Sequence, residues 1–130
     1  MDHASAKAEL RALERRLYAL GYAQSAIYLD SVTVAPRDTS EGRGVAAGEL
    51  SAWEHSLFVT DRNRELLVFL TQTPSAEPLV RREAEVLLRR LDWMTAIPAD
   101  EYSAYSVLIN DAENVWYDAK KRSDFASFLP

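Results

Sequence analysis

Leucines near the N-terminus set the first regular pattern in the chain. They recur three or four residues apart, which is the spacing of one face of an α-helix: Leu10, Leu13, Leu17 and Leu20. The pattern predicts a first helix from about Ser5 to Leu29 or a little beyond. Residues 31–34 then form a weakly helical, largely β-branched run, and Pro36 cannot continue a helix. We therefore expect the first helix to end near Asp30.

Residues 35–44 are the one long loop that the sequence predicts, because Pro36, Gly42 and Gly44 lie in it. Asp38 and Glu41 have the spacing of a capping pair for the helix that follows. That helix mixes small residues with bulky ones: Ala46, Ala47, Gly48 and Ala52 with Leu50, Trp53, Leu57 and Phe58. We expect it to be buried on two sides, with a neighbouring backbone close to its small residues.

A short third helix and a longer fourth helix follow. Thr60 or Asp61 can cap the third helix, whose apolar residues are Leu66, Leu67, Phe69 and Leu70. Ser75 is a fair N-cap for the fourth helix, and Pro78 lies in its tolerant first turn. The apolar stripe of the fourth helix consists of Val80, Ala84, Leu87, Leu88, Leu91 and Met94.

Pro98 separates the fourth helix, which we expect to end near Ile97, from a fifth. Apolar residues of the fifth helix alternate at spacings of three and four: Tyr102, Tyr105, Ile109, Ala112, Trp116 and Ala119. Such a stripe predicts a core seam. The sequence as a whole therefore predicts an all-α antiparallel bundle of about five helices, in a single helical domain over residues 1–130.

Composition and charge narrow the possible partners and compartment. Hydrophobic residues make up 48% of the 130, which is enough for a real core. The formal charge of −5 argues against nucleic acid or an anionic membrane as a partner, since both need a cationic surface. The chain has no cysteine, no apolar signal segment and no stretch long enough to span a bilayer. We expect a soluble, cytoplasmic protein.

Candidate chemistry is sparse. The only histidines are His3 and His55, and no HExxH motif is present. A di-metal bundle needs a Glu-x-x-His pair, but Ala52 stands three residues before His55. We expect no catalytic, cofactor-binding or metal-binding residue in this chain.

The stretch "LDSVTVAP", which contains Asp30, resembles a segment near the N-terminus of the carboxypeptidase Taq family of zinc metallopeptidases. That segment reads Trp-Asp-x-x-Thr-x-Met-Pro, and the shared positions here are Asp30, Thr33 and Pro36. Leu29 and Ala35 stand where the family commonly has Trp and Met. Asp30 could end the first helix by pairing with backbone donors or with Thr33, or it could line a substrate cleft in a complete enzyme; we favour the structural role.

The end of the chain is similar to a second family segment. That segment has an Ile/Val-Pro-Ala opening, a helix with a central Trp and an Asp-Phe-x-x-Phe-x-Pro close. The matching positions here are Ile97, Pro98, Ala99, Trp116, Ala119, Asp124, Phe125, Phe128 and Pro130. We expect structural roles for the family-matching residues Asp30, Thr33, Pro36, Pro98, Trp116, Asp124, Phe125 and Phe128.

The resemblance implies the first quarter or so of a family enzyme. The zinc-binding HExxH, its glutamate ligand and the substrate-binding motifs of the family would all lie beyond Pro130. Zinc would therefore bind only in a complete enzyme, and we expect the isolated chain not to be an enzyme.

Three interpretations of the function are open to a chain with these features. The first is a non-catalytic helical interaction module, which forms a homodimer or holds a protein partner through apolar helix faces. The second is a fragment of a zinc metallocarboxypeptidase that contributes to the peptide-binding cleft only when the catalytic remainder is present. The third is a small-ligand pocket among Trp53, Trp93, Trp116 and the six tyrosines, although aromatic residues at helical spacing usually form a core.

Overall fold

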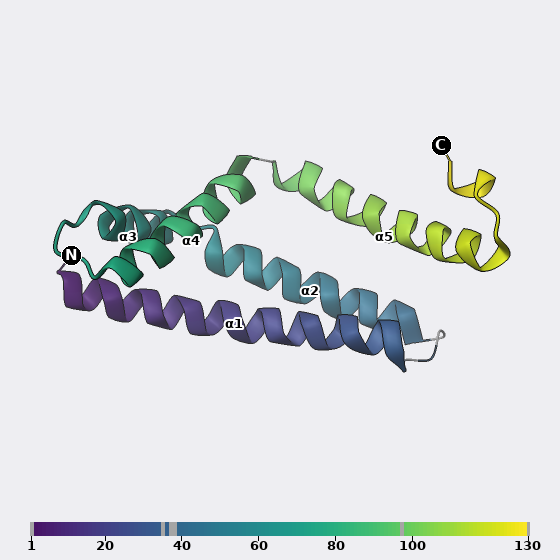
Figure 1. Cartoon of the computed structure of the whole chain (residues 1–130), viewed down its shortest axis with the longest axis horizontal. Coiled ribbons are helices and arrows are strands. Elements are labelled where there is room, and N and C mark those ends of the chain that lie inside the picture. The colour runs from purple at the N-terminus through teal and green to yellow at the C-terminus, as the bar shows by residue number, and fades with distance from the viewer. Residues whose placement is uncertain (1, 35, 37–38, 97, 130) are drawn as a thin grey trace. The chain divides into compact units, whose positions relative to one another are not determined.

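The computed structural model describes residues 2–34, 36, 39–96 and 98–129 (Figure 1). Within these ranges the chain is almost entirely helical and contains no strand, which confirms the predicted all-α fold with five helices. The elements are α1 (His3–Thr33), α2 (Ser40–Phe58), α3 (Asp61–Gln72), α4 (Pro78–Ala96), α5 (Ala99–Arg122) and the 3-10 turn η2 (Ala126–Phe128).

The chain divides into two compact units, residues 1–94 and residues 95–130. The first unit contains α1 to α4, and the second contains α5 and η2. The single domain expected over residues 1–130 stays a prediction.

In the first unit, α1 and α2 run side by side, and α3 and α4 lie near the beginning of α1 (Figure 1). The core confirms most of the predicted stripes of α1, α3 and α4 and adds one residue of α2: Leu10, Leu13, Leu17, Phe58, Leu66, Leu67, Leu70, Val80, Ala84 and Leu91. Leu20, the last leucine of the predicted α1 stripe, is only partly buried and is not in this core. Leu87, Leu88 and Met94 pack against this core at its edge. Arg11 adds a polar link between α1 and α4, because its Nη1 lies 2.8 Å from a carboxylate oxygen of Glu83.

The end of α1 differs from the prediction. The helix continues through the β-branched run to Thr33 instead of ending near Asp30. Two hydroxyls on this turn donate to backbone carbonyls of the same helix: Ser31 Oγ to Tyr28 at 2.6 Å and Thr33 Oγ1 to Leu29 at 2.6 Å. These bonds keep the hydroxyls inside the helical pattern, so weak helix propensity does not end the helix here.

The predicted loop over residues 35–44 is wrong from residue 40 onward, because α2 begins at Ser40 and therefore includes Gly42 and Gly44. A turn around Pro36 leads into the helix: the Pro36 carbonyl accepts hydrogen bonds from Thr39 N at 3.2 Å and from Arg43 Nη1 at 3.3 Å. The capping pair predicted from Asp38 cannot be compared, since residues 35, 37 and 38 lie outside the described ranges.

The prediction that α2 is buried on two sides is also wrong for the described residues. Phe58 is the buried residue of this helix, whereas Trp53 is 62% exposed and Val45 is 63% exposed. No described atom from a neighbouring element lies within 4 Å of a Cβ built on Gly48, so this glycine is not needed for a close approach. Trp53 and Val45 therefore do not belong to the core of the first unit.

Thr60 caps α3, as predicted, and accepts a hydrogen bond from Asn63 N at 3.1 Å. The largely buried Asn63 side chain turns back and donates to the carbonyls of Leu57 at 2.9 Å and Phe58 at 2.8 Å. One side chain on α3 therefore satisfies two carbonyls at the end of α2, which fixes the sharp turn between the two helices.

Ser75 is not the N-cap of α4, so that prediction is wrong. The helix begins at Pro78, and Arg81 N donates to the carbonyl of Glu77. The Arg81 guanidinium also donates to the carbonyls of Thr73 at 2.9 Å and Pro74 at 3.0 Å, and these bonds hold the α3–α4 turn in place of a serine cap. At the other end α4 reaches Ala96, and Ile97 lies outside the described residues.

In the second unit, α5 ends at a residue whose backbone has the left-handed conformation. Ser123 has φ of 53°, and its N–H bonds to the carbonyls of Ala119 and Lys120, while Asp124 N reaches the Ala119 carbonyl at 2.9 Å. The Asp124 carboxylate then caps the short turn η2 by accepting from Ser127 N at 3.3 Å and from Ser127 Oγ at 2.6 Å. These bonds reverse the chain after α5.

Within the second unit, the described residues of the predicted core seam of α5 are largely exposed. Ala119 is buried, but Tyr105, Ile109 and Trp116 are 56%, 40% and 46% exposed. The side chain of Tyr102 lies outside the description.

Candidate functional site

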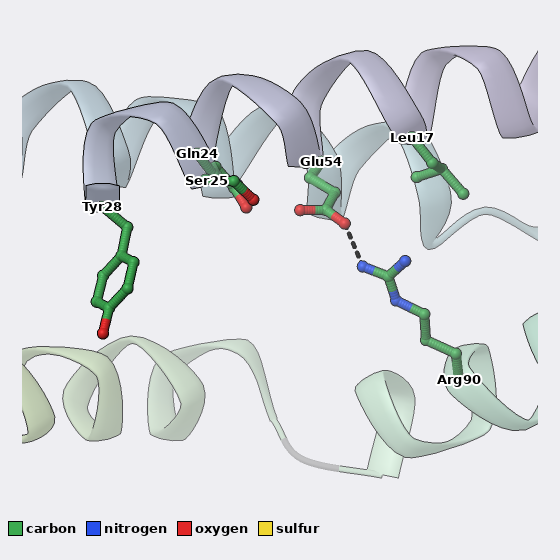
Figure 2. Close-up of a pocket in the computed structure, with 7 residues that line it drawn as sticks. Leu17, Gln24, Ser25, Tyr28, Glu54 and Arg90 are labelled. Carbon is green, nitrogen blue, oxygen red and sulfur yellow. Dashed lines mark hydrogen bonds and ion pairs between the residues drawn. The ribbon is translucent and has the colours of Figure 1, made fainter. Parts of the chain in front are cut away.

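The first unit carries a shallow polar hollow of about 420 Å³ on the side of α1 that meets α2 and α4 (Figure 2). Three helices supply its lining: Leu17, Gly21, Gln24, Ser25 and Tyr28 from α1, Glu54 from α2 and Arg90 from α4. The helical repeat explains why the α1 residues meet there, since residues spaced three and four apart share one face.

Glu54 and Arg90 form an ion pair across this hollow (Figure 2). The Glu54 side chain is only 13% exposed, and the Arg90 guanidinium also lies over the ring of the buried Phe58, 5.2 Å from its centroid. Arg90 thus joins α4 to α2 through both a charge and an aromatic face. The two side chains neutralise each other's charge, so this pair leaves no isolated charge in the hollow that would require a ligand.

Metal ligands do not gather anywhere in the described part of the chain. No three His, Asp or Glu side chains there are close enough together to hold a metal ion. His3 lies at the start of α1 and His55 lies near the end of α2, so the two histidines belong to different helices. The described residues therefore do not fit a zinc site, and no reaction step can be derived through zinc here.

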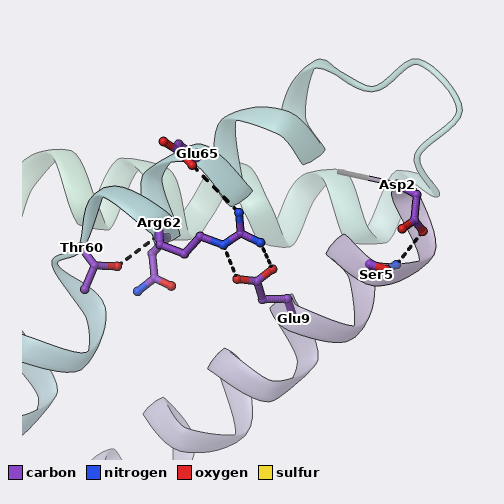
Figure 3. A network of polar contacts seen from close by, with 7 residues as sticks. Asp2, Ser5, Glu9, Thr60, Arg62 and Glu65 are labelled. Carbon is purple, nitrogen blue, oxygen red and sulfur yellow. Dashed lines mark hydrogen bonds and ion pairs between the residues drawn. The ribbon is translucent and has the colours of Figure 1, made fainter.

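Polar contacts near the N-terminus hold α1 against α3 (Figure 3). The Arg62 guanidinium donates to both carboxylate oxygens of Glu9, at 2.8 Å and 2.7 Å, and these hydrogen bonds raise the pKa of Arg62. Asp2 caps α1 by accepting from Ser5 N at 3.0 Å, and its hydrogen bonds with Ser5 lower the pKa of its carboxyl group. This network is exposed and stabilises the arrangement of helices rather than forming a reactive site.

The structure places the first group of family-matching residues around the end of α1. Asp30 and Thr33 lie in its last turn, and Pro36 follows in the connection to α2. The Asp30 backbone carbonyl accepts from Val34 N at 3.2 Å, whereas its carboxylate makes no hydrogen bond to any residue that the structure describes. The side-chain pairing expected of Asp30 is instead made by Thr33, which bonds to Leu29.

The second group surrounds the ends of α5. Pro98 immediately precedes the helix, Trp116 lies near its C-terminal end, and Asp124 and Phe125 lie in the turn before η2. Phe128 belongs to η2, but its side chain lies outside the description.

The sequence of almost the whole chain fits one known family. The sequence profile of the Carboxypeptidase Taq (M32) metallopeptidase family matches residues 9–130. The chain belongs to this family. The family assignment from the two resembling segments is thereby confirmed.

Individual carboxypeptidases of this family show how much of a family member the chain represents. The chain is 30% identical to carboxypeptidase 1 of Bacillus subtilis over 119 residues, which are 91% of this chain and 24% of that protein. It is 29% identical to thermostable carboxypeptidase 1 of Pyrococcus furiosus over 122 residues, which are 94% of this chain and 24% of that protein. The chain therefore spans about a quarter of the length of these relatives.

A solved structure agrees with the fold. The carboxypeptidase of Pyrococcus furiosus has a segment that superposes on 98% of this chain with a TM-score of 0.82, at 26% sequence identity. That segment is 25% of the solved chain. The helices described above thus resemble the corresponding quarter of that solved carboxypeptidase.

Sequence reasoning missed the Glu54–Arg90 pair and the Asn63 contact with α2. The first joins residues 36 positions apart, and helical periodicity carries no information on such long-range pairs. A signal for the second was present, since Asn63 follows the predicted cap Thr60 by three residues and is a polar residue in an otherwise apolar helix face.

None of the described helices combines the length and the apolar character that crossing a bilayer requires.

Proposed function

We propose that this chain acts as a non-catalytic helical interaction module of the carboxypeptidase Taq family and binds protein through its apolar helix faces. The observation that carries the proposal is the exposure of large apolar side chains along helices of both units. Large residues that are more than 55% exposed include Tyr18, Tyr22, Tyr28, Trp53, Trp93, Leu108 and Phe125. Contiguous exposed apolar surface marks interaction sites in soluble proteins.

The exposed residues follow helix faces and are not scattered singly. On α1, Tyr18, Tyr22, Leu29 and Val32 share one face and are 58% to 71% exposed. The rings of Tyr18 and Tyr22 lie 6.3 Å apart, so these two side chains form a small aromatic surface. A helix that packs on one side and presents a second apolar stripe is suited to a partner that covers it.

The non-catalytic part of the proposal is supported by the chemistry of the available donors. The chain contains two histidines and no cysteine, and three of its carboxylates, on α1, α2 and α4, are paired with arginines: Glu9, Glu54 and Glu83. A zinc hydrolase needs three ligands around one ion and an open position for water.

Metal analysis combined with a peptidase assay tests this part. We expect no stoichiometric zinc in chelator-free protein and no release of a C-terminal residue from blocked dipeptides. Stoichiometric zinc together with turnover that His55→Ala abolishes would contradict the proposal. The interaction part is tested by the fluorescence of a dye that binds apolar surface, and we expect an increase that falls when a partner or a second copy covers the faces.

A second function is favoured by the family and by the length of the relatives. As a fragment of a zinc metallocarboxypeptidase, the chain would contribute to a peptide-binding cleft that the remaining three quarters complete. The polar hollow with Glu54 and Arg90 supplies groups that could contact a peptide in such a cleft. The test is complementation: the chain is added to Bacillus subtilis carboxypeptidase 1 lacking its matching quarter, and recovered activity that Arg90→Ala weakens would favour this function.

A further inference from the structure

We draw no further inference here: the strongest candidate, the polar hollow that α1, α2 and α4 form in the first unit, belongs to the site already described, and because its two charged groups, Glu54 and Arg90, are paired with each other, nothing in the structure shows what would occupy it.

Discussion

Thr39 and Thr60 occupy the same position before their helices, but only Thr60 caps with its side chain. Thr60 Oγ1 accepts from Asn63 N at 3.1 Å, whereas Thr39 makes no side-chain bond to a helix N–H and donates instead to the Pro36 carbonyl. We expect Thr60→Ala to lower the free energy of unfolding by about 1 kcal/mol, as loss of a cap does. Thr39→Ala should cost less than half of that. Chemical denaturation measures both, and equal losses would show that the assignment of the cap is wrong.

Asn63 holds the end of α2 to α3 through a single side-chain amide. Its amide nitrogen donates to the carbonyls of Leu57 and Phe58 in a largely buried position. Asn63→Asp keeps the shape but removes both donors, and we expect a loss of about 1–3 kcal/mol in the free energy of unfolding. Thermal and chemical denaturation at neutral pH would reveal it. A variant as stable as the unmodified chain would mean that these two carbonyls find other donors.

Hydrogen bonds lower the pKa of three carboxyl groups and thereby make stability depend on pH. The pKa of Asp2 is lowered by bonds with Ser5, that of Glu77 by Lys7, and that of Asp124 by Ser127. A carboxyl group whose pKa is lower in the folded state than in the unfolded state stabilises the fold above its unfolded pKa. This contribution is lost as the pH falls through the folded pKa.

We therefore expect the melting temperature to fall on acidification through and below the ordinary carboxyl range. Asp2→Asn is the informative variant, because asparagine is also a good N-cap but does not titrate. Its melting temperature should fall less steeply with acidification than that of the unmodified chain. If the melting temperatures of the two proteins fell equally steeply with acidification, Asp2 would not contribute to the pH dependence of stability.

At the scale of a single helix, the position of the apolar stripe can be tested on α4. Leu91 is 1% exposed in the core, whereas Leu79 on the same helix is 65% exposed. We expect Leu91→Ala to lower the free energy of unfolding by about 2–5 kcal/mol, because it removes buried methyl groups and leaves a cavity. Leu79→Ala should stay within about 0.5 kcal/mol of the unmodified chain. Similar losses for both variants would contradict the position of the core.

The presence of the five helices could be predicted from the sequence, but the residues at which they begin and end could be predicted less well. Five helices and the α1, α3 and α4 stripes follow from a periodicity that the core enforces. The end of α1 differs from its prediction because Ser31 and Thr33 turn their hydroxyls onto carbonyls of their own helix, and α2 starts early because a turn at Pro36 leads directly into it. These outcomes depend on local hydrogen bonds that residue propensities do not contain.

At the scale of the whole molecule, the sequence predicted apolar faces but not what covers them. Periodicity identified the faces of α2 and α5 as apolar, and burial is the ordinary expectation for such faces. The structure leaves Trp53, Leu108 and Trp116 exposed. A periodic pattern shows that a helix has an apolar side, yet the partner of that side depends on contacts outside the helix. The same limit applies to the polar hollow, whose ion pair joins α2 to α4.

The central claim is that these uncovered faces bind protein, and the molar mass in solution tests it most directly. Light scattering coupled to size exclusion should give a mass that rises from 14.7 kDa toward twice this value as the concentration increases from micromolar upward. The dye signal from exposed apolar surface, per chain, should fall over the same range. A mass that stays at that of one chain throughout, with no dye bound, would contradict the account.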